Sequence, residues 1–261
     1  MNSSLWVSKT GLSAMDKQLN VVANNLANVS TTAFKKDRAV FEDLMYKTVR
    51  APGGLSAQNA ELPSGLQLGT GVKVGATQKD FSNGDYNLTD RQLDIAIQGK
   101  GFLQVLQPDG TIAYTRNGSL QLNSEGQIAT AGGLLLEPVI QINPDAVEIM
   151  IAEDGVVSVR MAGEADSQQV GAINIAGFIN PTGLSSAGQN IYQETNASGP
   201  PIVGVPGTDS LGTISQGMLE ASNVNSVEEL VNMISTQRAY EMNSKVISAA
   251  DGMMSFAIQQ L

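Results

Sequence analysis

The chain has 261 residues, of which 42% are apolar and 15% charged, with a net charge of -10 and a pI of about 4.4. This acidic balance argues against nucleic acid or an anionic membrane surface as the main partner, because both require a basic patch. Cysteine and histidine are absent, which excludes disulfides, thiolate nucleophiles, Cys/His zinc sites and a Ser-His-Asp triad.

The first 30 residues predict a helix that packs against another helix. Apolar side chains recur at alternating steps of three and four, a heptad seam interrupted only by Ser8; they are Leu5, Leu12, Met15, Leu19, Val22, Leu26 and Val29. Four asparagines inside this helix each cost about 0.7 kcal/mol relative to alanine, roughly 2–3 kcal/mol together. A helix with this cost must be held by packing.

Residues 31–91 predict extended structure after the helix ends near Ser30. The stretch 51–71 is rich in glycine, alanine, serine, glutamine and proline, so it has no core of its own. A flexible surface loop is the simpler interpretation of this stretch, and an extended arm is the alternative.

From about residue 92 the apolar period changes from 3.5 to 2, beginning with Leu93, Ile95 and Ile97. Turn signals such as Asn117-Gly118 and Asp154-Gly155 then recur at short intervals, and such pairs favour tight hairpins because their residues tolerate positive φ. We therefore predict an antiparallel β domain over residues 92–195, with a second loose connection after it.

The end of the chain predicts a second helix with its own apolar seam, expected to answer the first: Leu230, Ile234, Met242, Val246 and Met253. Two interpretations remain open. The helices form an ordinary intramolecular pair that closes a globular domain, or they pack between many copies of the chain.

The predicted fold class is α+β, with paired N- and C-terminal coiled-coil helices, an extended β arm region and an inserted antiparallel β-rich outer domain. We expect a terminal helical core from residues 1–30 with 226–261. A connecting arm domain is expected from 31–91 with 196–225, and the outer domain from 92–195.

Motifs at both ends of the chain resemble the signatures of bacterial flagellar rod and hook proteins, and the resemblance covers nearly the whole sequence. The motif positions are Asn24, Asn25, Leu26 and Asn28 near the start, and Asn223, Asn225, Arg238 and Tyr240 near the end. Residues 39–71 resemble the segment found in members that form the distal rod, including Tyr46, Arg50, Pro52, Leu62, Pro63 and Gly65. Hook members lack part of this segment, and a hook or proximal rod member is the alternative.

The resemblance implies a structural axial protein that polymerises into a helical tube, with terminal helices in the core and the β domain outside. Implied partners are other copies of the chain, proximal rod proteins, the hook protein, surrounding ring proteins and the export apparatus. The implied location is the flagellar basal body, from periplasm to outer membrane, reached without a cleaved signal peptide. In such a tube the asparagines would fix register at a helix seam or face the channel, and residues 46–65 would stiffen the polymer.

We predict no enzyme activity and no catalytic, metal-binding or cofactor-binding residues, because the sequence offers no credible carboxylate pair for glycoside cleavage. Nucleic acid binding is not expected because of the acidic charge balance. Membrane insertion is not expected because no run of about 18 apolar residues is present. A soluble periplasmic β-domain binding module is the alternative from a different class.

Overall fold

A computed structural model of the chain describes residues 3–50, 55–57, 60–61, 64–163, 166–208 and 210–259. The predicted α+β class is confirmed, because a helix stands near each end and an antiparallel β-rich region lies between them. The chain forms two compact units. The first contains both helices and residues 37–79, and the second contains residues 28–36 and 80–224.

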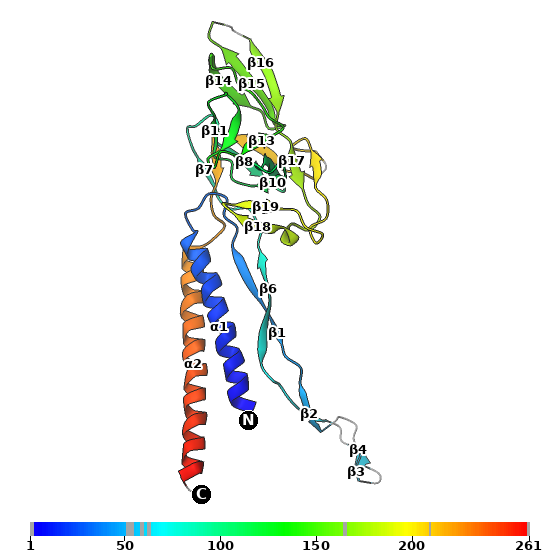
Figure 1. Cartoon of the computed structure of the whole chain (residues 1–261), viewed down its shortest axis with the longest axis vertical. Helices are drawn as coiled ribbons and strands as arrows, with labels where there is room; N and C mark the ends of the chain where they lie inside the picture. Colours follow the sequence, from blue (N-terminus) through cyan, green and yellow to red (C-terminus); the bar gives the residue numbers. More distant parts are fainter. Residues whose placement is uncertain are drawn as a thin grey trace. The chain divides into compact units, whose positions relative to one another are not determined.

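In the first unit, α1 (Ser3–Ala27) and α2 (Ser226–Gln259) lie side by side and run antiparallel (Figure 1). α1 is shorter than the predicted 1–30 because a turn follows it. The backbone N–H of Thr31 donates to Asn28 O at 3.1 Å, and the Thr31 hydroxyl donates to Asn28 Oδ1 at 3.1 Å. Polar side chains that bond to nearby groups in this way compete with helical hydrogen bonding. Asn28 and Val29 of the predicted helix therefore lie beyond its end, in the second unit.

The same unit contains a long antiparallel hairpin. Described residues of the 51–71 stretch form paired strands within it, which favours an extended arm over a flexible loop for these residues. Three two-stranded ladders follow one another from the base of the hairpin toward its turn. The strands are β1 (Asp37–Asp43) with β6 (Val72–Lys79), β2 (Lys47–Arg50) with β5 (Leu66–Leu68), and β3 (Leu55–Ala57) with β4 (Ala60–Glu61). Both β1 and β6 contact α1, so the base of the hairpin is anchored on that helix.

The second unit is built on antiparallel strands. Among the described residues its largest sheet has nine strands, in the order β11-β12-β13-β9-β10-β19-β18, with β17 pairing β9 and β20 pairing β17. These strands are β9 (Phe102–Leu106), β10 (Ile112–Thr115), β11 (Leu120–Leu122), β12 (Ile128–Thr130), β13 (Leu135–Glu137), β17 (Ile175–Gly177), β18 (Ser185–Gly188), β19 (Ile191–Gln193) and β20 (Ile202–Gly204). A 3-10 turn, η1 (Pro181–Gly183), precedes β18.

Smaller sheets complete this unit: β14-β15-β16, β8 with β21, and β7 with β22. Their strands are β7 (Tyr86–Leu88), β8 (Ile95–Gln98), β14 (Ala146–Ile151), β15 (Val156–Met161), β16 (Ser167–Ala172), β21 (Thr213–Gln216) and β22 (Met218–Glu220). The alternating residues of 93–105 point into one core, where Ile95, Leu103 and Ile128 are fully buried. The β region is thus the most extensively buried part of the chain.

A separate arm domain over 31–91 with 196–225 stays a prediction. In the structure its residues are divided, since 37–79 cluster with the helices and 80–91 and 196–224 with the β region.

A buried cluster of ionic side chains holds the second unit together, and sequence analysis gave it no role. Glu220 Oε1 lies 2.6 Å from Lys35 Nζ, and Glu220 Oε2 lies 2.9 Å from Arg116 Nε. Lys35 also donates to Ser82 O at 2.6 Å, and the Gly84 N–H donates to Glu220 Oε1 at 3.1 Å. All three charged side chains are at most 2% exposed, a setting in which every partner matters because water cannot replace a lost one.

Arg116 also explains a glycine pair in the sequence. Its guanidinium donates to Gly99 O at 3.0 Å and to Gly101 O at 3.0 Å. Both glycines have positive φ, 112° and 138°, a conformation that residues with a Cβ rarely adopt. The Gly99-Lys100-Gly101 stretch therefore turns two carbonyls toward one buried cation.

Candidate assembly surfaces

The predicted seam of α1 is partly covered along the helix. Val22 is buried, with 2% of its surface exposed. The other helical seam residues are half-buried, namely Leu5, Leu12, Met15, Leu19 and Leu26. Small residues lie beside them, and a Cβ placed on Gly11 would sit 3.3 Å from Asn243 Nδ2 of α2. This close approach fixes which stretches of the two helices lie opposite each other.

The predicted seam of α2 points away from α1 within one chain, so its role as an assembly surface stays a prediction. Its five residues are 46%, 50%, 61%, 48% and 67% exposed, in the order Leu230, Ile234, Met242, Val246 and Met253. A different and more polar face of α2 is covered instead. Its fully buried members are Glu229, Thr236 and Ala250, and Asn232, Met233, Ala239, Asn243, Ile247 and Met254 are half-buried.

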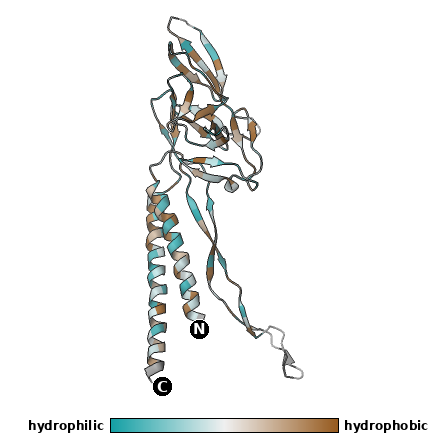
Figure 2. Cartoon of the chain, in the orientation of Figure 1, coloured by the Kyte–Doolittle hydropathy of each residue, from teal (hydrophilic) through white to brown (hydrophobic). Residues whose placement is uncertain are grey.

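Hydrophobicity along α2 identified a face that needs covering, but not which surface covers it. Figure 2 shows hydrophobic residues recurring along the length of α2. We call the exposed set Leu230, Ile234, Met242, Val246 and Met253 the α2 stripe. Arg238 and Tyr240 from the C-terminal motif are also exposed on this helix, so this part of the motif lies on the surface of the unit.

The motif asparagines anchor local structure. The Asn25 side chain is 2% exposed and bonds the backbone of Asp37. Asn225 Oδ1 accepts from the N–H groups of Val227 and Glu228 at 3.0 and 3.3 Å, which makes it the N-cap of α2. Asn223 accepts from the Lys36 N–H and donates to Asp80 O, both at 2.8 Å. Asn24 lies on the exposed side of α1, whereas Asn28 lies in the turn that follows the helix.

The predicted rod-specific positions are only partly described. Tyr46 and Arg50 are exposed on the hairpin and Gly65 is half-buried, whereas Pro52, Leu62 and Pro63 lie outside the described residues. The hairpin also exposes a set of large apolar side chains: Phe41, Met45, Val49, Leu66 and Leu68. A two-stranded ladder is at best marginally stable by itself, so this surface also calls for a partner.

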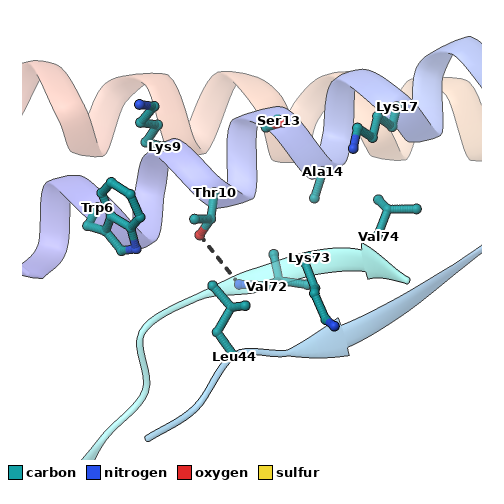
Figure 3. Close-up of a pocket in the computed structure, with 10 residues that line it drawn as sticks. All are labelled: Trp6, Lys9, Thr10, Ser13, Ala14, Lys17, Leu44, Val72, Lys73 and Val74. Carbon is teal, nitrogen blue, oxygen red and sulfur yellow. Dashed lines mark hydrogen bonds between the residues drawn. The ribbon is translucent and has the colours of Figure 1, made fainter. Parts of the chain in front are cut away.

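A groove lies between α1 and the base of the hairpin (Figure 3). Its volume is about 260 Å³, and it is lined by Trp6, Lys9, Thr10, Ser13, Ala14, Lys17, Leu44, Val72, Lys73 and Val74. The Val72 N–H donates to Thr10 Oγ1 at 3.4 Å, which ties the helix to β6. None of the lining residues in this described part of the chain is acidic. Sequence analysis missed the groove, because its walls come from segments about 60 positions apart.

Nothing among the described residues points to a metal centre, since no group of three or more acidic side chains gathers there. Across the same residues, neither helix is both long and apolar enough to span a membrane.

Comparison with known proteins identifies similar sequences at both ends and in the middle. Three family descriptions match: "Flagella basal body rod protein" over residues 5–35, "Flagellar hook protein FlgE/F/G D1 domain" over 96–159, and "Flagellar basal body rod FlgEFG protein C-terminal" over 215–260.

Whole-length relatives are also found. The flagellar basal-body rod protein FlgG of Buchnera aphidicola subsp. Schizaphis graminum is 53% identical, covering 97% of this chain and 98% of its own. FlgG of Borreliella burgdorferi is 43% identical, covering 98% of each. Among solved structures, the Helicobacter pylori hook protein FlgE2 covers 71% of this chain and 43% of its own, at 16% identity. Its TM-score of 0.25 is too low to support a conclusion.

Proposed function

This chain belongs to the flagellar basal-body rod protein family, and from that premise we propose how its surfaces build a rod. It is a structural protein of the flagellar distal rod, as its relatives at 53% and 43% identity support. In our proposal the chain polymerises into a rigid helical tube that transmits motor torque to the hook. Because both of these relatives are rod proteins, the rod is favoured over the hook.

The observation that carries the proposal is the exposure of the α2 stripe. Large apolar side chains at about half exposure or more, spread along the side of α2 that α1 leaves uncovered, are unfavourable in water. Burying each contributes on the order of 1–2 kcal/mol. Because every copy carries the same stripe, neighbouring copies can cover this surface for one another without a different partner protein. The exposed apolar side chains of the hairpin have the same need.

Both interpretations of the terminal helices therefore contribute. α1 and α2 pack against each other within one chain through the seam of α1, while the α2 stripe serves contacts between chains. The tube is also proposed to contact proximal rod proteins at one end, the hook protein at the other, and the ring proteins around it.

The proposed location is the basal body, from the periplasm to the outer membrane, after export through the flagellar export apparatus without a cleaved signal peptide. The proposed structural role requires no catalytic activity. A lytic assay on cell-wall polymer tests whether the protein has such activity. A soluble periplasmic binding module is disfavoured by the whole-length identity to rod proteins.

Residues 46–65 are proposed to stiffen the tube by reaching onto the next copy. The described part of this segment continues the hairpin through the β2–β5 and β3–β4 ladders. Deleting residues 46–65 should produce polymers that bend, as measured by filament curvature in electron microscopy. Polymers that stay straight after the deletion would contradict this role.

The assembly proposal is tested by the double variant Ile234→Ser and Val246→Ser. The monomer should keep its thermal unfolding midpoint, because both side chains are already about half exposed, but sedimentation should show that it no longer polymerises. A matched control changes two exposed α2 residues off the stripe, Ser244→Ala and Ser248→Ala. Equal polymerisation of stripe and control variants would overturn the proposal.

A further inference from the structure

The end of α2 extends past the described start of α1. Gly11 lies opposite Asn243, and in an antiparallel pair each step back along α1 matches a step forward along α2. Ser3 therefore lies near the level of Asp251, and Gly252–Gln259 extend beyond it by roughly 12 Å at 1.5 Å per residue. We call Gly252–Gln259 the α2 overhang.

The overhang carries apolar side chains that this helix pair leaves open. Ala250 is the last fully buried residue of α2, and beyond it Met253 and Phe256 are 67% and 62% exposed. Its electrostatic character is negative. Asp251, immediately before the overhang, is the only charged residue from 246 to 261, and the C-terminal end of a helix carries about half a negative charge from its dipole.

The groove between α1 and the hairpin has the complementary character. Trp6, Leu44, Val72 and Val74 supply apolar surface, and three lysines surround them (Figure 3). Lys73 is paired with Glu42 at 2.9 Å. Among the described residues, neither Lys9 nor Lys17 forms an ion pair. The Lys9 ammonium lies 5.5 Å from the centre of the Trp6 ring. Two exposed cations thus remain without an acidic partner.

The size of the groove fits protein side chains. Sites for drug-sized ligands span about 300–1,000 Å³, and this groove of about 260 Å³ falls below them. A dry cavity of about 150 Å³ is known to hold a benzene ring. The groove therefore has room for one phenyl ring with part of a thioether chain, the pair of groups that Phe256 and Met253 carry.

We propose that the groove between α1 and the hairpin of one copy receives the α2 overhang of a second copy, with Phe256 and Met253 inserted and Asp251 facing Lys9 or Lys17. This contact rests on the proposed polymer and gives it a specific joint. It links α2 of one copy to both α1 and the arm of the next, so the three parts of the first unit share one interface.

The test uses the absence of cysteine from the natural chain. A variant with Ser13→Cys in the groove and Met253→Cys in the overhang is polymerised under reducing conditions and then oxidised. Within one chain Met253 lies about twelve residues past the level of Ser13, roughly 18 Å along the helix, too far for a disulfide. The expected result is a ladder of linked chains, whereas each single-cysteine variant forms dimers at most.

The matched control replaces Met253→Cys by Ser248→Cys, an exposed position of α2 before the overhang. It should give no ladder. Polymers visible by electron microscopy that give no Ser13–Met253 ladder, or the same ladder in the control, overturn the joint and leave the proposed function standing. Failure of the unmodified chain to polymerise under any condition tested would count against the proposed function itself.

A second measurement does not depend on disulfide geometry. Reversing both lysines, Lys9→Glu with Lys17→Glu, should raise the concentration needed for polymerisation by up to about fivefold at low salt, and adding Asp251→Lys should restore much of it. The effect should shrink in high salt because exposed charges are screened. If neither reversal changes assembly, and polymers still form, the groove has another occupant and the joint is wrong.

Discussion

Asn25 and Asp37 form a reciprocal pair of hydrogen bonds between a side chain and the main chain. Asn25 Nδ2 donates to Asp37 O at 2.9 Å, and the Asp37 N–H donates to Asn25 Oδ1 at 2.9 Å. The amide therefore copies the pairing of a neighbouring strand and fixes where β1 begins relative to the end of α1. Sequence alone left this residue between a helix seam and a channel surface, but its partner is the hairpin of the same chain.

Asn25→Ala should loosen the base of the hairpin. Two backbone groups of Asp37 lose their partner, which costs about 1–3 kcal/mol for a buried polar group. Hydrogen exchange of the β1 and β6 amides should become faster. Asn20→Ala is the control, since Asn20 is exposed on α1 and alanine should favour the helix by up to about 0.7 kcal/mol. Unchanged protection in Asn25→Ala would show that the pair does not anchor the hairpin.

Glu220→Gln should strongly destabilise the second unit. The substitution leaves Lys35 and Arg116 as buried cations without their anion, and breaking a buried pair in this way typically costs about 3–5 kcal/mol. Urea unfolding followed by near-UV circular dichroism measures the loss. The control is Glu148→Gln, which breaks the exposed pair with Arg160 and should cost at most about 1 kcal/mol. Equal losses of unfolding free energy in the two variants would mean that the buried cluster stabilises the unit no more than an exposed ion pair does.

The same carboxylate should make the second unit sensitive to acid. Burial raises the pKa of Glu220, but the charges of Arg116 and Lys35 outweigh it and hold the pKa below the usual 4.5. A lowered pKa means that the stabilisation is fully present above about pH 4.5 and is lost as pH falls through the folded-state value. Unfolding free energy should therefore decline below pH 4.5 more steeply in the natural chain than in Glu220→Gln. Parallel pH profiles would refute this assignment.

In the alkaline range, titration of Lys35 should also make the second unit more stable as pH rises. Burial and then the nearby charge of Arg116 lower the pKa of Lys35 below the usual 10.5, against the pull of Glu220. Because the folded state disfavours the charged lysine, stability should rise as pH increases toward 10.5. Lys35→Met removes this titrating group, so the difference in unfolding free energy between the two chains should change with pH over this range. A constant difference would contradict the expected slope.

Asn225→Ala should weaken the start of α2. The lost side-chain cap leaves the first N–H groups of the helix unsatisfied, which costs about 1 kcal/mol. Asn225→Ser should retain most of the stability because serine is also a good N-cap. Helix content by far-UV circular dichroism and hydrogen exchange at Val227 and Glu228 measure the effect. Equal behaviour of the alanine and serine variants would rule out the capping role.

Gly71→Ala should disturb the packing of the hairpin on α1. Gly71 has a φ of 120°, and a Cβ there would lie 2.1 Å from Thr10 Oγ1. Gly69→Ala is the control, because its Cβ would make only an ordinary contact of 3.6 Å with Tyr46. Protease cleavage within residues 64–79 should accelerate in Gly71→Ala and not in Gly69→Ala. Matching cleavage rates would show that the hairpin accommodates the change.

The sequence alone determined the elements whose signal is local. Steps of three and four predicted both terminal helices, and the change to a period of two located the β region. Asp154-Gly155 correctly marked the β14–β15 hairpin, but the hairpin expected at Asn117-Gly118 was wrong, because β10 and β11 on either side of it pair with other strands. Apolar periodicity works here because a helix or strand repeats its environment every few residues. The family motifs likewise identified Asn25, Asn223 and Asn225 as special, although not what they bond.

Only the tertiary structure decided which surfaces meet. Glu220 finds Lys35 and Arg116 across sequence separations of 185 and 104 residues, and no local pattern announces such a pair. The arm became a hairpin because β2 and β5 pair across the segment between them. The α2 stripe was visible in the sequence, but α1 covers the opposite, more polar face. Hydrophobicity measures how much a face gains by leaving water, whereas the shape and small residues of the opposing helix determine which face it covers.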